Sequence, residues 1–411
     1  MRIRTIIILA YLLIAVLMGV ASYVIIGLSQ DSLETQIGKS SIFLSTEIMD
    51  KVNRHLFGLI QQLQFLTGDS QLQKELASSN NEFSKMPDVE RYIDGMDTAW
   101  ISAPRSRITP FMQDIIQNEA SAELRGFTSF YKEKYGYPLY GEIFVTNRYG
   151  ANVAQTGKTS DYRQNDEEWW QIAREKGIYI GHVGYDESAD VYSIDIGIGI
   201  HDKAGNFIGA AKAVLNVQEI FSIMEAISLE TPYKDLHIKL VADDGTLIYA
   251  QRDFEFLKNV SNEDYFRMAT GQQGYFLGEE TLNSVTEEEF ISYVKFNEYG
   301  GIPNPGWTLF LQYDADTALA PVTELRNALL KISLVIIGLS LAMGSFVSRI
   351  ISEPLEKLTR IMDELSRGDM RAGIDSNLLK QKNEIGKLAQ AFDRILVSLK
   401  LCISDLKKGK K

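Results

Sequence analysis

The stretch IGIHDKAGNFIGA, residues 198–210, contains an apolar segment, a turn centred on a glycine and a second apolar segment. The same pattern occurs in IFVTNRYGANVAQ (143–155) and IKLVADDGTLIYA (238–250), so that Gly150, Gly205 and Gly245 each lie seven positions after an isoleucine. Because glycine adopts positive φ without steric cost, each stretch predicts a β-hairpin. A helical segment (217–228) and Pro232 separate the first and third stretches, which predicts a duplicated α+β module.

Length and charge limit the class of protein. At 411 residues, with 45% apolar and 23% charged residues, the chain can form two or three folded domains. The net charge of −12 argues against a nucleic-acid partner. From Ile350 onward, however, 13 Lys/Arg outnumber 9 Asp/Glu. We therefore expect the acidic and basic parts to lie in different compartments.

Two apolar runs predict membrane-spanning helices. Residues 5–28 lack any charge and follow Arg2 and Arg4, and at about 1.5 Å per residue they are long enough to cross a bilayer. A cleaved secretory signal is the alternative. A second run covers 330–349. Residues 1–4 and the basic tail 404–411 are then cytoplasmic, and 29–329 lie on the periplasmic or extracellular side of the membrane. The only cysteine, Cys402, is in the cytoplasmic part that precedes this tail, so the external part folds without disulfides.

The external region is expected to contain three kinds of segment. Apolar residues at three- and four-residue spacings predict one amphipathic helix over about 29–76. The polar stretch 77–110, with its prolines, is interpreted as a connector with a short helix at most, and a further helical stretch follows near 111–135. GWTLFLQYD (306–314) is expected to be a closing strand. The distal module would cover about 77–228 and the proximal module about 229–320.

The C-terminal segments carry a coiled-coil pattern. EPLEKLTRIMDELSRGD (353–369) and NEIGKLAQAFDRILVSLK (383–400) place apolar residues at alternating spacings of three and four. Each helix is too short to be stable alone in water. Two chains in parallel would form a four-helix bundle with two packings a few kcal/mol apart, which suits a signal relay. The alternative is an ordinary helical hairpin packed on another part of the chain.

These segments together resemble the double Cache receptors of bacteria. The external part, about 31–320, is similar to their sensor domains, most specifically over 169–220, and 350–403 resembles a HAMP linker. The resemblance implies a long helix, two tandem PAS-like antiparallel-sheet modules, two membrane helices and a parallel HAMP coiled coil. Its matching relay positions are Pro354, Leu358, Met362, Leu365, Glu384, Ile385, Leu388 and Phe392.

The resemblance also implies a ligand site in the distal module. Cache receptors that bind amino acids use a Tyr, an Arg that grips the carboxylate, a Trp-aromatic pair, a later Tyr and an Asp. This chain matches at Tyr162, Trp169, Trp170 and Tyr185, but has Glu167 at the Arg position and Asn216 near the Asp position. Loss of the Arg favours a cation or amine bound on the tryptophan faces.

Further polar side chains of the segment 185–195 can project toward such a pocket: Asp186, Ser188, Tyr192 and Asp195. Alternatively, the tryptophans are core residues and the acidic residues belong to a solvated turn. The sequence offers no catalytic set and no metal-ligand spacing among its four histidines, so neither an enzyme nor a cofactor is expected.

Receptors of this type continue into an output domain, which this sequence does not show. We therefore expect a homodimer in a bacterial inner membrane that senses an amine or amino-acid-like solute and is read by a separate cytoplasmic signalling protein, or a truncated relative of such a receptor. A membrane-anchored binding protein without signalling is the alternative.

Overall fold

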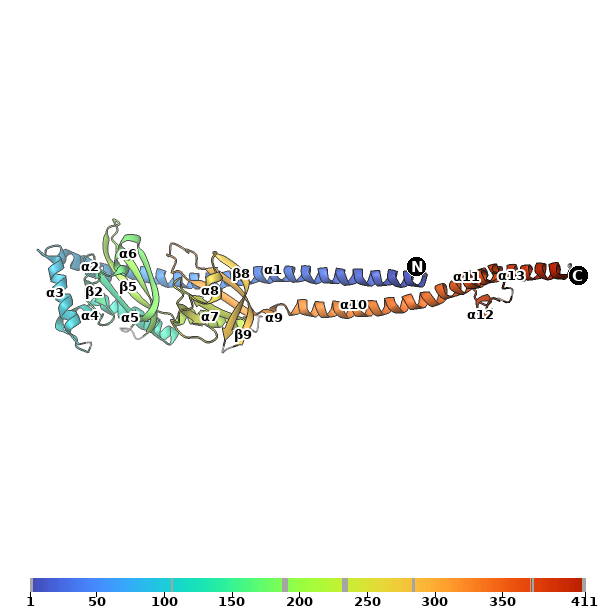
Figure 1. Ribbon diagram of the computed structural model, residues 1–411. Helices are drawn as coiled ribbons and strands as arrows, with labels where there is room; N and C mark the ends of the chain where they lie inside the picture. Colours follow the sequence, from blue (N-terminus) through green and yellow to red (C-terminus); the bar gives the residue numbers. More distant parts are fainter. Residues whose placement is uncertain are drawn as a thin grey trace. The chain divides into compact units, whose positions relative to one another are not determined.

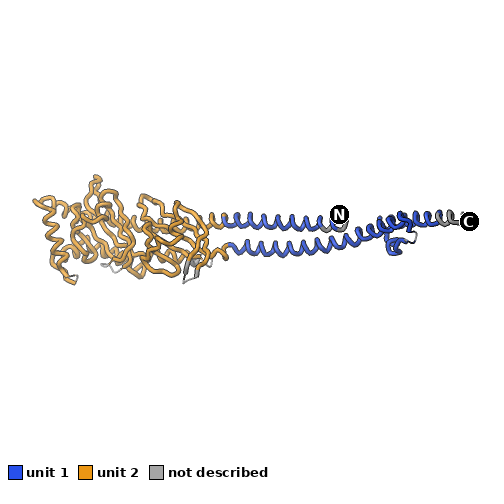
Figure 2. Tube along the Cα trace, in the orientation of Figure 1, with its two compact units in different colours: residues 1–34, 319–411 blue, residues 35–318 orange. Residues whose placement is uncertain are grey.

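A computed structural model describes residues 3–104, 106–186, 191–230, 236–282, 285–369, 371 and 373–408 (Figure 1). The chain forms two compact units (Figure 2): residues 35–318, and residues 1–34 together with 319–411. The longest element is helix α1 (Ile3–Thr67), which contributes to both units. The predicted α+β fold, with a long N-terminal helix, two antiparallel sheets and C-terminal helices, is confirmed.

Both sheets of the larger unit have the same topology, which confirms the duplication. The first has the order β2-β1-β5-β4-β3 and the second β7-β6-β10-β9-β8, and the strand pairs described are antiparallel. The turn glycines adopt the predicted positive φ, from 83° to 85°. The strands are β1 (Tyr140–Asn147), β2 (Asn152–Gln155), β3 (Ile178–Asp186), β4 (Val191–His201), β5 (Phe207–Asn216), β6 (His237–Val241), β7 (Leu247–Ala250), β8 (Gln273–Leu282), β9 (Val285–Lys295) and β10 (Thr308–Asp314).

Helices occupy most of the stretch 77–110, where the sequence predicts a connector with a short helix at most. After α1 ends at Thr67, the chain forms α2 (Ser70–Phe83), capped by Asp69, and α3 (Val89–Ser102), capped by Asp88. Ile93 and Trp100 of α3 are buried and share its inner face with partly buried apolar residues. Their helical spacing was visible in the sequence, but the flanking prolines obscured it. The expected helical stretch near 111–135 is α4 (Pro110–Gln117) and α5 (Glu119–Tyr135).

One core joins α1 to both sheets. Apolar residues of α1 pack against every second residue of the strands, on the sheet face that points toward the helix; examples are Ile196 of β4 and Leu311 of β10. The shared α1 residues include Ile48, Val52, Leu56, Leu59 and Leu63, each at most 3% exposed. Because strand side chains alternate between faces, the opposite face of each sheet remains for other elements. Short helices cover these faces: α6 (Glu168–Lys176) lies on the first sheet and α8 (Asp264–Met268) on the second.

The smaller unit contains the expected membrane helices and linker. The beginning of α1 and helix α10 (Ala320–Val347) are long and apolar enough to cross a membrane. A five-residue π-helical segment, η1 (Ser348–Ser352), joins α10 to α11 (Glu353–Ser366). Helices α12 (Ser376–Leu379) and α13 (Glu384–Lys408) follow. The remaining helices, α7 (Gln218–Glu230) and α9 (Ala315–Ala318), belong to the larger unit.

Candidate functional site

Helix α6 approaches β4 closely because glycines line that strand. A Cβ added to Gly199 would lie 2.4 Å from the carbonyl oxygen of Ala173, and one added to Gly197 would lie 3.1 Å from Trp169. Trp169 is only 3% exposed and meets Phe144 edge to face, with 5.7 Å between ring centroids. The glycines of IDIGIGI therefore position α6, and with it the predicted Trp pair, directly on the sheet.

The three predicted aromatic residues Tyr162, Trp169 and Trp170 are all buried. The indole N–H of Trp170 donates to Thr146 Oγ1 at 2.9 Å, and that of Trp169 donates to Gln164 Oε1 at 3.3 Å. Tyr162 stacks on Trp100 of α3, in a different apolar cluster. These three rings therefore pack as core residues, as the alternative interpretation predicts, although Trp169 also borders charged groups.

A polar cluster lies beside Trp169, and we call it the Lys212 cluster: Asp161, Glu167, Tyr179, Asp195 and Lys212. The ammonium of Lys212 pairs with Asp195 at 2.7 Å and lies 5.9 Å from the centre of the Trp169 ring. The pKa of Glu167 is raised, first by partial burial and then by the Asp161 carboxylate. The Lys212 ammonium offsets part of this increase. A lysine of the chain itself therefore occupies the position over the tryptophan face that the sequence predicts for a ligand cation.

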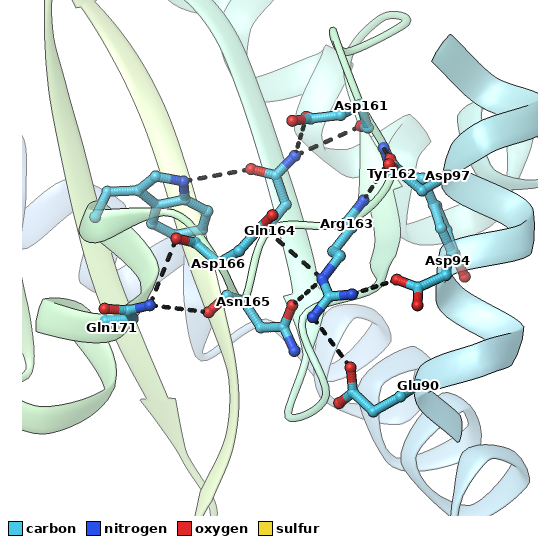
Figure 3. A network of polar contacts seen from close by, with 11 residues as sticks. Glu90, Asp94, Asp97, Asp161, Tyr162, Arg163, Gln164, Asn165, Asp166 and Gln171 are labelled. Atoms are coloured by element: carbon cyan, nitrogen blue, oxygen red, sulfur yellow. Dashed lines mark hydrogen bonds and ion pairs between the residues drawn. The ribbon is translucent and has the colours of Figure 1, made fainter. Parts of the chain in front are cut away.

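The loop before α6 is fixed by helix α3 (Figure 3). Asp97 Oδ1 accepts hydrogen bonds from the backbone N–H groups of Tyr162 and Arg163 at 2.8 and 3.1 Å. The Arg163 guanidinium contacts Asp94 and Glu90 of α3 and donates to Asn165 at 2.8 Å. Although Arg163 lies near the expected position of a ligand-binding arginine, its fork is engaged with acidic side chains of α3.

Other predicted ligand residues do not join the Lys212 cluster. Tyr185 and Tyr192 are about half exposed and contact each other near the end of the β3–β4 pair. Tyr192 also contacts Phe256 of the second module. Strand alternation places Tyr192 on the sheet face opposite Asp195. Asp186, the last residue of β3, lies at the same end of the hairpin.

Asn216 and Ser188 complete the comparison with the predicted set. Asn216 donates to the Pro138 carbonyl at 3.1 Å and accepts from the Gln218 amide at 2.9 Å, so its side chain holds the start of α7. Ser188 lies outside the described residues. Of the predicted residues, the structure therefore brings Glu167, Trp169 and Asp195 together.

Sequence reasoning missed Lys212, Asp161, Gln164 and Tyr179. Lys212 is the only charged residue in the strand FIGAAKAVLN, and a lone charge in a buried strand was the available signal. Burial raises the pKa of Tyr179, and the carboxylates of Glu168, then Asp195 and Glu167, raise it further. A separate groove of about 410 Å³ lies between the modules, lined by residues that include His182, Asp243 and Pro303.

The predicted relay residues lie on facing helices of the smaller unit. Leu358 is buried with Leu378 and Ala389, and Ile385 and Phe392 pack against this cluster. Pro354 and Leu365 are also buried, Met362 is half-buried and Glu384 is exposed. Leu388, Ile395 and Leu399 remain 39%, 48% and 41% exposed. One chain thus buries part of the predicted seam and leaves an apolar row on α13 uncovered.

Comparisons with known proteins agree with the predicted resemblance. Residues 346–400 match the HAMP domain family, which confirms the predicted linker. The chain is 20% identical over 319 residues to methyl-accepting chemotaxis protein McpA of Pseudomonas putida, covering 75% of this chain and 46% of that protein. It is 22% identical over 252 residues to McpC of Bacillus subtilis, covering 60% and 35%. The chain therefore spans less than half the length of these relatives.

Solved structures include similar chains. The ligand-binding domain of the Pseudomonas fluorescens chemoreceptor CtaA, in complex with L-isoleucine, is 12% identical with a TM-score of 0.40 and covers 71% of this chain and 95% of that one. The corresponding domain of Campylobacter jejuni chemoreceptor Tlp3, in complex with L-norvaline, is 15% identical with a TM-score of 0.39 and covers 70% and 94%.

Proposed function

We propose that this chain is the sensing and transmitting part of a bacterial transmembrane chemoreceptor. The observation that carries the proposal is the HAMP domain at 346–400, which begins at the end of the candidate span α10 and follows two tandem sensor modules. A ligand in the external unit would shift α10, and the HAMP helices would change packing. We place the sensor in the periplasm, the membrane as the inner membrane and the HAMP helices in the cytoplasm, where another protein or segment would read them.

The exposed apolar row on α13 supports a homodimer. Leu388, Ile395 and Leu399 repeat at spacings of seven and four, as residues of a coiled-coil seam do. A second chain in parallel would cover this row and complete a four-helix bundle. Because such bundles can adopt alternative packings, this element could be biased by a ligand bound at the other end of the chain.

The Lys212 cluster favours an amino-acid-like ligand over a simple amine. Lys212 already fills the position of a cation beside Asp195 and the Trp169 ring. A ligand carboxylate could pair with this ammonium, taking the role of the missing arginine, while Glu167 and Asp161 could accept the ligand ammonium. No enzymatic step is assigned to the cluster.

Cysteine crosslinking tests the signalling role. In a Cys402→Ser background, Leu388→Cys places a thiol on the seam, and Arg394→Cys is a matched control off the seam of the same helix. The proposal expects efficient disulfide formation between copies at 388, little at 394, and a change at 388 when ligand is added. Equal crosslinking at both positions would contradict the dimer seam, and a ligand that binds without changing it would favour the anchored binding protein.

Calorimetric and thermal-shift screening of the full chain identifies the ligand class. Amino acids, amines, carboxylates and purines are compared, because a ligand at a hundred times its Kd stabilises a protein by about 2.7 kcal/mol. Amino acids should stabilise the chain, and Lys212→Met should abolish the effect, whereas Lys176→Met on the exposed side of α6 should not. A response to amines alone, retained in Lys212→Met, would refute the assignment of the carboxylate to Lys212.

A further inference from the structure

The second sheet buries polar side chains on the face that α8 covers. Gln312 of β10 is 0% exposed and Glu289 of β9 is 2% exposed. Within the described part of the chain, both amide atoms of Gln312 and Oε2 of Glu289 lack a hydrogen-bond partner. Leaving a buried polar group unpaired destabilises the folded state. Such groups call for a partner, either water or a ligand.

Strand register places the two side chains together. Gln312 pairs with Ile291 of β9 and His237 of β6, and Glu289 lies two residues from Ile291, on the same face. Diagonal neighbours of this kind are about 7–8 Å apart, a distance that a small molecule can bridge. The residue opposite Glu289 on β8 is Gly278, which places no side chain there.

A buried ion pair lies over the same face. Lys239 of β6 contacts Glu280 of β8, both side chains are about nine-tenths buried, and the Lys239 ammonium lies 4.6 Å from the centre of the Tyr265 ring of α8. The first module contains groups of the same kinds on other strands, with Lys212 on β5, Asp195 on β4 and the Trp169 ring on α6. Each module therefore places a lysine, a carboxylate and an aromatic ring beneath its covering helix, although not at equivalent strand positions.

The charges around Glu289 indicate what the second module lacks. Lys239 is engaged by Glu280, and among the described residues Glu289 has no ion-pair partner within 4.0 Å. Together with Glu289, the carboxylates nearby therefore outnumber the cations, and the Lys239 ammonium is already paired with Glu280. The titratable and charged groups that face Glu289 or border its cluster are Glu280 on β8, Lys239 and His237 on β6, Asp314 on β10, Tyr293 on β9, Arg252 after β7 and Tyr265 on α8.

We propose that the membrane-proximal module contains a second ligand site, in which Glu289 accepts the ammonium of a small primary amine and the Gln312 amide bonds a hydroxyl or carbonyl group next to it. Entry requires the Lys239–Glu280 pair and α8 to move aside, since these groups cover the face. The proposal goes beyond the distal ligand site and does not depend on which solute that site binds.

Binding at this site would be coupled to release of a proton. Burial, reinforced by Glu280, raises the pKa of Glu289 to about 7, so below that pH the carboxyl is mostly neutral. An ammonium ligand favours the charged carboxylate. Its affinity should therefore fall as pH decreases below about 7 and become constant above it, giving about tenfold tighter binding at pH 8 than at pH 6.

Titration of the full chain in lipid nanodiscs with ethanolamine tests the proposal. Calorimetry at pH 6 and pH 8 should show saturable binding that is about tenfold tighter at the higher pH. Glu289→Gln should abolish the binding, as should the nearly isosteric Gln312→Leu. Glu288→Gln, an exposed neighbour on the same strand, and Asp195→Asn in the distal module should retain it.

Three results would overturn the proposal. Absence of saturable binding by the folded wild-type chain would show that the unpaired atoms serve water alone. Binding lost in Asp195→Asn but retained in Glu289→Gln would assign ethanolamine to the distal module. Binding that does not change between pH 6 and pH 8 would exclude Glu289 as the acceptor. None of these results affects the crosslinking test of the HAMP seam, so the two proposals fail separately.

Discussion

Replacement of Glu289 by glutamine should make the second module less sensitive to pH. Glu289 is 2% exposed, and burial raises its pKa from the ordinary 4.5 to about 7. Between these values the folded chain retains a proton that the unfolded chain has lost. The free energy of unfolding therefore decreases as pH rises from about 4.5 to about 7, and is constant outside this window as far as this group is concerned.

The size of the effect follows from the two pKa values. A difference of about 2.5 in pKa corresponds to about 3 kcal/mol, at about 1.4 kcal/mol for each pKa unit. Because glutamine has no titrating proton, the variant lacks this loss. The difference in unfolding free energy between Glu289→Gln and wild type should thus increase by about 2–3 kcal/mol from pH 5 to pH 8, whatever constant cost the substitution has.

Urea unfolding of the full chain in nanodiscs at several pH values measures this difference, with hydrogen exchange of β9 and β10 as a local probe. Glu288→Gln is the matched control, because this neighbour is exposed on the same strand. If both variants show the same pH dependence as the wild type, Glu289 is ionised in the folded module at neutral pH and the reasoning fails.

Three further predictions concern the first module and the relay. Gly199→Val should prevent α6 from docking, because the Cβ position is 2.4 Å from the Ala173 carbonyl, and loss of ordered structure by circular dichroism would show this; an unchanged melting temperature would refute the close approach. Trp169→Ala should lower the free energy of unfolding in urea by about 3–5 kcal/mol, whereas Trp169→Phe should cost less, and equal costs would argue against tight packing. Ile395→Asp should weaken self-association measured by sedimentation, while Arg394→Asp should not; equal behaviour would place the dimer contact elsewhere.

Local patterns predicted most of the fold. The three glycine turns, the apolar period of α1 and the heptad spacing of the HAMP helices depend on neighbours in the sequence, and all three are present. The helix α3 was missed because the prolines on either side of it and its own polar residues are typical of a loop. What makes it helical is the burial of Ile93 and Trp100 against Tyr162 and other distant residues, and this contact is not visible in a local window.

The site shows the same division more sharply. The sequence by itself determined that Trp169, Glu167 and Asp195 lie in one module, and the resemblance of the residues around them suggested a ligand. Only the tertiary structure decided that Lys212 takes the cation position, that Arg163 turns to α3, and that Gln312 and Glu289 share a buried face. These facts depend on strand order, register and the covering helix, which bring together residues far apart in the chain, and charge pairing and burial act only between groups that the fold has made neighbours.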